Sequence, residues 1–92
     1  MQRLGYVRES NSGQSSEKNK QKLRQYGCSI IYRDIHNKNE STTSGFETLI
    51  KDLKKGDEVV AISFDHLATS LTKLITNVQK IREKEAHIKI LN

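Results

Sequence analysis

The chain has 92 residues, 34% of them hydrophobic, which leaves room for one small domain and excludes a two-domain protein. Its single cysteine, Cys28, excludes an internal disulfide, and without a signal-peptide pattern or an apolar run of bilayer length we expect a cytoplasmic protein with no membrane partner. The net charge of +5 permits a polyanionic partner such as nucleic acid but does not establish one, because the basic residues point around a predicted helix rather than along one face.

The first part of the chain predicts a strand and a helix. Residues 4–8 begin with the apolar run Leu-Gly-Tyr-Val, which is typical of a buried strand, and residues 9–13 are typical of a polar turn. A helix should begin at a capping serine, residue 15 or 16, and end at Tyr26. Gly27 then supplies the left-handed residue that commonly follows a helix.

The middle of the chain predicts a second strand, a loop and a second helix. Residues 29–32 are β-branched and aromatic, which favours a strand, whereas residues 34–43 are polar with one exception, so we expect a mobile loop there. Residues 44–47 have the spacing of a capping box, and the helix that follows would place four apolar side chains on one face, Phe46, Leu49, Ile50 and Leu53. Residues 54–56, Lys-Lys-Gly, would end it.

The last third of the chain completes an alternating pattern. Residues 58–64 predict a third buried strand, and residues 88–91 a short fourth one. Between them, an amphipathic helix ends near Glu85 and has its apolar face at Leu71, Leu74, Ile75 and Val78. The alternation predicts a single domain, residues 1–92, in which helices cover both faces of a mainly parallel four-stranded sheet, a three-layer α/β/α sandwich.

Functional side chains should gather beyond the carboxyl ends of the strands, where ligands bind in open sheets of this kind. The informative loops therefore follow Arg8, Arg33 and Phe64. The first loop offers Arg8, Ser10 and Gln14: a serine at the exit of a strand can act as a nucleophile, and a nearby arginine can stabilise a phosphate. The alternative for Ser10 is a turn residue, whereas a charge such as that of Arg8 at the end of an apolar strand needs a partner.

The third loop offers Asp65 and His66. Asp65 could orient His66 or Arg8, and His66 could carry a proton near neutral pH. Alternatively, Asp65 makes a local hydrogen bond while Thr69 or Ser70 caps the next helix. The cysteine and the three histidines lack any metal-ligand spacing, and the chain has neither a G-x-G-x-x-G nor a Walker loop, so we expect no metal site and no cofactor.

These candidate residues form an ordered series along the chain. Tyr6-x-Arg8-x-Ser10 with Gln14 behind it is followed by Gly45-Phe46, Gly56-Asp57, Asp65-x-Leu67 and Ser70. The series resembles the catalytic domain of the serine recombinases, the resolvases and invertases, whose corresponding elements are Y-x-R-x-S with a downstream glutamine, R-P-G-[FL], G-D, and D-R-L-G-R-S. The resemblance is colinear over essentially all 92 residues.

The resemblance implies a site-specific DNA recombinase that needs no metal or nucleotide. Ser10 would attack a DNA phosphodiester, become joined to the 5′ phosphate and release a 3′ hydroxyl, and reversal of this step would rejoin the strands after exchange. Arg8 would stabilise the transition state, whose negative charge is spread over the phosphoryl oxygens. By the same resemblance, Asp65 belongs to the catalytic set, and Gln14 and His66 belong to the residues that contact the substrate.

Three arginines of the family are replaced in this chain, by Thr43, His66 and Thr69. Loss of one preorganised donor costs roughly a hundred- to a thousand-fold in rate, so we expect weak or absent catalysis, with His66 substituting in part when it is protonated. The family's dimerisation helix and helix-turn-helix domain are not found before Asn92. We therefore expect non-specific phosphate contacts with DNA at most, and a homodimer or another recombinase as the protein partner.

An alternative function is a catalytically inactive recombinase-like module that regulates DNA transactions through protein contacts. The replaced arginines favour this reading. A flavodoxin-like domain for a small ligand is a weaker alternative, since no phosphate loop supports it.

Overall fold

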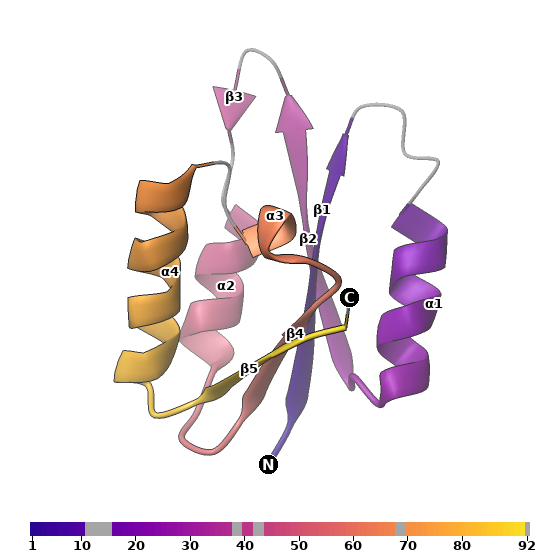
Figure 1. Ribbon diagram of the computed structural model, residues 1–92. Helices are drawn as coiled ribbons and strands as arrows, with labels where there is room; N and C mark the ends of the chain where they lie inside the picture. Colours follow the sequence, from indigo (N-terminus) through magenta and orange to yellow (C-terminus); the bar gives the residue numbers. More distant parts are fainter. Residues whose placement is uncertain (11–15, 38–39, 42–43, 68–69, 92) are drawn as a thin grey trace.

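The computed structural model describes residues 1–10, 16–37, 40–41, 44–67 and 70–91. Within them, one sheet has the strand order β3-β2-β1-β4-β5 (Figure 1). Four strands run parallel to their neighbours, and the two-residue β3 pairs antiparallel with the end of β2. The strands are β1 (Arg3–Ser10), β2 (Ile30–Asn37), β3 (Glu40–Ser41), β4 (Glu58–Ala61) and β5 (His87–Ile90). The chain thus passes from β2 on one side of the central β1 to β4 on the other, which places a topological switch point at the carboxyl ends of β1 and β4.

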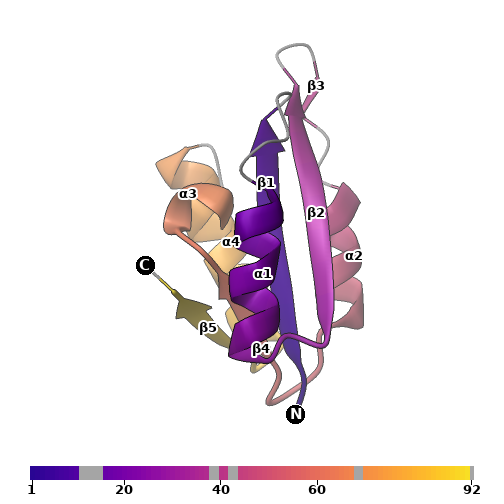
Figure 2. The same ribbon diagram turned by 90° about the vertical axis from the view of Figure 1, so that its right-hand side faces the viewer.

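Helices cover both faces of this sheet. They are α1 (Ser16–Tyr26), α2 (Ser44–Asp52), α3 (Phe64–Leu67) and α4 (Leu71–Glu83). Neighbouring strand residues point to opposite faces, so Val7 packs with Leu23 of α1, whereas Tyr6 packs with the cluster that includes Phe46 of α2, Leu67 of α3 and Ile81 of α4. Figure 2 shows α1 and α2 on opposite sides of β1 and β2. The predicted three-layer sandwich and its four parallel strands are confirmed.

The expected mobile loop over residues 34–43 is wrong for part of that segment. β2 continues through Asn37, and β3 pairs with its end, where His36 lies opposite Ser41. Polarity was a poor guide because the Asp34 side chain is only 3% exposed and accepts hydrogen bonds inside the protein. β1 likewise continues through Ser10, into the segment predicted as a turn, and the remainder of that turn lies outside the described residues.

Glycines end α1 and close the turn after α2, as the sequence predicted. Gly27 has φ +107° and Gly56 has φ +86°, conformations that L side chains rarely adopt. The turn at Gly56 is reinforced by Asp57, whose buried carboxylate accepts the backbone N–H of Gln2 at 2.9 Å and of Lys54 at 3.0 Å. The Gln2 N–H holds the pKa of Asp57 below its usual value, burial acts in the opposite direction, and the Lys54 N–H adds to the lowering.

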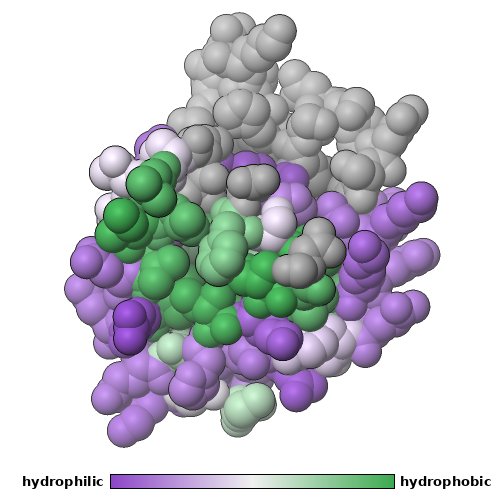
Figure 3. Space-filling view, in the orientation of Figure 1, coloured by the Kyte–Doolittle hydropathy of each residue, from purple (hydrophilic) through white to green (hydrophobic). Residues whose placement is uncertain are grey.

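An apolar surface remains exposed on the face seen in Figure 1. The third strand ends at Ala61 rather than at residue 64, and Phe64 instead begins α3 with 52% of its surface exposed. On α4, Leu71 and Ile75 are 73% and 52% exposed although both belong to the predicted inner face. Figure 3 shows apolar side chains gathered over α3, α4 and β5, and we call Phe64, Leu71 and Ile75 the apolar band. No helix in the described part of the chain is long and apolar enough to span a membrane.

Replacement of Gly45 by alanine tests the close approach of α2 to β2. An added Cβ would lie 2.4 Å from the carbonyl oxygen of Arg33, so α2 would have to move away from the sheet. We expect Gly45→Ala to lower the free energy of unfolding in urea by about 1–3 kcal/mol, the usual cost of overpacking, although alanine is the better helix former. The matched control is Gly56→Asn, because a Cβ there meets nothing within 4 Å and asparagine tolerates a positive φ. An equal stability loss in both variants would contradict the steric explanation.

Candidate active site

The residues singled out by the sequence motifs lie around the carboxyl end of β1. In the β1–β2 pairing, Arg8 lies opposite Asp34 and Ser10 lies opposite His36. α3, which contains Asp65 and His66, begins three residues after β4 and packs against β1. The fold therefore brings the first and third informative loops to the topological switch point, where ligands bind in sheets of this type.

Asp34 is the polar centre of this region. Its carboxylate accepts the phenol O–H of Tyr6 at 2.5 Å and the backbone N–H groups of Gly45 and Phe46 at 2.7 and 3.0 Å. The last two donors belong to the first turn of α2, where backbone N–H groups lack partners within the helix and the dipole favours a negative charge. A carboxylate from β2 thus caps α2. The predicted capping box assigned this task to Ser44, whose side chain lies outside the described part.

Arg8 is connected to Asp34 through Tyr6. The Tyr6 ring is fully buried, and burial is the main reason that the pKa of its phenol lies well above the ordinary value. The hydrogen bond to Asp34 and the charge of that carboxylate raise this pKa further, whereas a hydrogen bond and the positive charge from Arg8 lower it. Arg8 is itself half-buried. Its guanidinium therefore belongs to a polar chain that runs from Arg8 through Tyr6 and Asp34 to α2.

The candidate site has two sides, which we call its walls. The polar chain from Arg8 to α2 forms the first wall, and the single-turn helix α3 forms the second. The His66 N–H donates to the carbonyl of Ser63 at 3.1 Å, and the Leu67 side chain is fully buried in the core. The side-chain amide of Asn77 on α4 donates to the carbonyl of Leu67 at 2.7 Å. His66 is half-buried, and the Asp65 side chain lies outside the described part.

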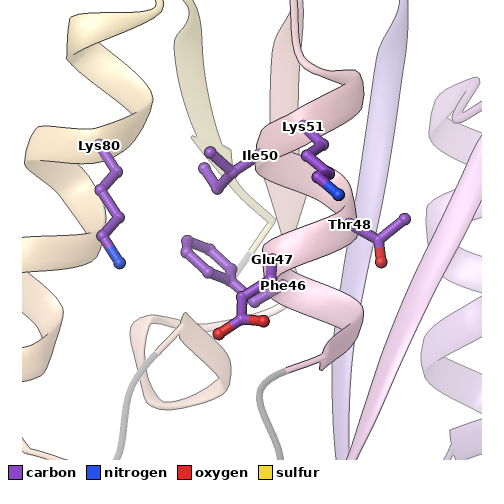
Figure 4. Close-up of a pocket in the computed structure, with 6 residues that line it drawn as sticks. All are labelled: Phe46, Glu47, Thr48, Ile50, Lys51 and Lys80. Carbon is purple, nitrogen blue, oxygen red and sulfur yellow. The ribbon is translucent and has the colours of Figure 1, made fainter.

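A groove of about 490 Å³ lies between α2 and α4 (Figure 4). Phe46 and Ile50 form its apolar lining, Lys51 and Lys80 bring positive charge to it, and Glu47 brings negative charge. Among the described residues of the recombinase-like motifs, Phe46 alone lines it. We therefore place the candidate active site at the end of β1 and not in this groove.

Sequence reasoning selected some of the site residues and missed others. Gln14, Thr43 and Thr69 lie outside the described residues, and the structure gives only the backbone position of Ser10 and Asp65. Asp34 and Asn77 were missed, and Tyr6 was noted only as part of a motif. A signal for Asp34 existed, since an acidic residue two positions after the apolar and aromatic run of residues 29–32 stands toward the end of the sheet where polar groups collect. Within the described residues, no group of three or more His, Cys, Asp or Glu could hold a metal ion.

The raised tyrosine pKa values predict a loss of stability in base. Phenols in the unfolded chain ionise near pH 10, whereas burial, followed by the hydrogen bond to Asp52, raises the pKa of Tyr32 to about 12, and the pKa of Tyr6 is also raised. Because the folded state holds these protons more tightly, the associated stability is fully present below pH 10 and is lost as the pH rises through the folded pKa values. For Tyr32 the loss should run from pH 10 to about 12.

Urea unfolding at a series of pH values from 8 to 12 would measure this effect. Tyr6→Phe should cost about 1–3 kcal/mol at neutral pH, because Asp34 loses a donor, and should flatten the decline above pH 10 relative to the parent chain. An unchanged dependence of stability on pH in Tyr6→Phe would show that folding does not raise the pKa of the Tyr6 phenol.

Comparisons with known proteins agree with this arrangement. The family model described as "Resolvase, N terminal domain" matches residues 3–92. Transposon Tn501 resolvase of Pseudomonas aeruginosa is 33% identical over 89 residues, which cover 97% of this chain and 46% of that protein. Serine recombinase gin of Escherichia phage Mu is 31% identical over 88 residues, covering 96% and 46%. The chain thus spans about half the length of the curated relatives it matches.

A solved structure gives the same result for the fold. The C-terminal catalytic domain of ISC1926 TnpA, an IS607-like serine recombinase, superimposes with a TM-score of 0.78 at 17% sequence identity. The superposition covers 100% of this chain and 68% of that one. Since the family model matches nearly every residue, this chain belongs to the resolvase N-terminal domain family of the serine recombinases.

Proposed function

We propose that this chain is the catalytic domain of a site-specific DNA recombinase that works in the cytoplasm through Ser10. The observation that carries the proposal is the placement of Arg8, half-buried at the carboxyl end of the central strand and two residues before Ser10. Arg8 lies beside the phenol of Tyr6, which donates to Asp34, and Asp34 in turn accepts from the first turn of α2. A guanidinium placed in this way can stabilise the charge of a phosphoryl transition state without reorganising during the reaction.

The proposed step is transfer of a DNA phosphoryl group to Ser10. The Ser10 oxygen attacks phosphorus and loses its proton, and the 3′ oxygen leaves and takes up a proton, so a phosphoserine and a free 3′ hydroxyl result. Attack of a 3′ hydroxyl on the phosphoserine reverses the step and joins new strands. The phosphoester bond is exchanged rather than hydrolysed, so no nucleotide is required, and Arg8 acts in both directions.

Asp65, Gln14 and His66 take the remaining roles in this proposal. Asp65 belongs to the catalytic set and is carried by α3 at the end of the sheet. Gln14 and His66 contact the DNA phosphate, and His66 stands where the family has an arginine, so it can supply positive charge only when protonated. Thr43 and Thr69 replace two further arginines and supply no positive charge, so weak activity is the expected result.

The replaced arginines also support a second function. A family member that keeps the polar framework around Arg8 but lacks three cationic residues could serve as an inactive module that pairs with another recombinase or with itself. Such a module needs the fold and its protein contacts but does not need transfer of a DNA phosphoryl group to Ser10.

Covalent trapping on DNA distinguishes the two functions. The full chain would be fused to a DNA-binding module of known site and incubated with duplexes in which two such sites flank a spacer of randomised sequence. Three versions run side by side: the native chain, Ser10→Ala, and a triple variant with Thr43→Arg, His66→Arg and Thr69→Arg. Label at the 3′ end of the cleaved strand should stay with the protein on a denaturing gel, because Ser10 would hold the 5′ phosphate.

We expect a faint native adduct, none from Ser10→Ala, and roughly a hundred-fold or greater increase in the triple variant, since one preorganised donor is worth that much. Ser12→Ala is the matched control, because it removes a neighbouring serine from the same segment and should leave the adduct unchanged. An adduct from the triple variant alone would favour the inactive module. An adduct that survives Ser10→Ala, or that carries the label of the 5′ end, would overturn the proposed chemistry.

A further inference from the structure

Asn77 is a polar residue on the inner face of α4. Leu74 lies three residues before it and packs against the core, and Ile81 lies four residues after it and is fully buried. Residues at these spacings share one face of a helix, so position 77 faces the same way. An apolar side chain is the ordinary choice at such a position, and a half-buried amide is costly there unless it forms hydrogen bonds.

The amide of Asn77 has a specific partner in α3. Its Nδ2 donates to the carbonyl oxygen of Leu67 at 2.7 Å. Leu67 is the last residue of α3, and the carbonyl groups at the end of a helix receive no hydrogen bond from within that helix. The Leu67 side chain is fully buried, so the same residue is held through its side chain by the core and through its backbone by α4.

We propose that Asn77 is a positioning residue that fixes α3, and with it Asp65 and His66, at the carboxyl end of β1. A helix of four residues is a single turn, which does not hold its shape without outside contacts. α3 packs against β1, and its register along that strand sets where residues 65 and 66 stand relative to Arg8. Asn77 lies on α4 and acts on the site through Leu67, so it is not a catalytic residue. The inference rests on the proposed function for its consequence in catalysis.

Two substitutions separate this role from a contribution to folding. Asn77→Leu places an apolar residue on the inner face and removes the hydrogen-bond donor to Leu67. It should leave the melting temperature unchanged. Asn77→Asp keeps the size and shape and replaces the donor by an acceptor that repels the Leu67 carbonyl. Gln79→Leu is the matched control, because Gln79 is an exposed residue of the same helix.

The first measurement is amide hydrogen exchange in the full chain without DNA. The His66 amide, which donates to the carbonyl of Ser63 just before α3, should exchange roughly 3- to 10-fold faster in both Asn77 variants, the range expected for loss of one hydrogen bond. The core amides of β1 should keep their rates in Asn77→Leu, and Gln79→Leu should match the parent. Unchanged exchange at His66 in Asn77→Leu and Asn77→Asp would overturn the assignment.

The second measurement is the rate of adduct formation in the fused, arginine-restored chain. We expect roughly a 10-fold or greater reduction in Asn77→Leu at an unchanged melting temperature, because small displacements of a catalytic group lower rates steeply. Gln79→Leu should retain the parent rate. Faster exchange combined with an unchanged adduct rate would overturn the positioning role. If the parent itself forms no adduct, the proposed function fails, while the exchange rates still decide whether Asn77 holds α3.

Discussion

The hydrogen bonds of one buried carboxylate, that of Asp34, join three separate elements of the chain. Tyr6 comes from β1, Asp34 from β2, and the N–H groups of Gly45 and Phe46 from α2. An anion inside a small domain is tolerable only when donors replace the water it has lost, and here a phenol and a helix N-terminus do so together. α2 must approach β2 closely for this to happen, which explains a glycine at position 45, where any Cβ would meet the Arg33 carbonyl.

The two walls of the candidate site are built on different principles. On the α2 side, hydrogen-bond donors surround the carboxylate of Asp34, and Arg8 adjoins this network at Tyr6. On the α3 side, Leu67 is buried among apolar side chains, and a neutral amide from α4 holds its backbone. The first wall depends on the hydrogen bonds of Asp34, and the second depends mainly on packing. The contacts named for the two walls do not come from Thr43, His66 or Thr69 side chains, the positions at which we propose that arginines of the family are replaced.

Local sequence patterns predicted most of the fold because they reflect local physics. Apolar runs predicted the four parallel strands, and a serine with a later glycine predicted the bounds of α1 closely. The errors arose where distant residues decide the outcome. Asp34 looked like part of a polar loop because its donors lie on β1 and α2, and β3 is defined only by its pairing with β2. Phe64 resembled the end of a buried strand, yet β4 ends at Ala61 and Phe64 begins α3.

The candidate site was predictable in part for the same reason. The spacing of Arg8 and Ser10 on a strand, and of Asp65 and His66 after another, could be read from the chain, since parallel strands end at a common edge. The contacts that position these residues could not be predicted in this way. Tyr6, Asp34 and Asn77 act through single tertiary contacts, and no periodicity marks a tyrosine that will meet a carboxylate 28 positions later.

The apolar band on α3 and α4 affects how the stability of this domain has to be measured. Phe64, Leu71 and Ile75 are exposed on the folded domain, so a molecule that covers them would bind the folded state and not the unfolded chain. Mass action then adds the free energy of that association to the free energy of folding. A second copy or a partner bound to this band would make the melting temperature depend on its concentration, so variants should be compared at one protein concentration.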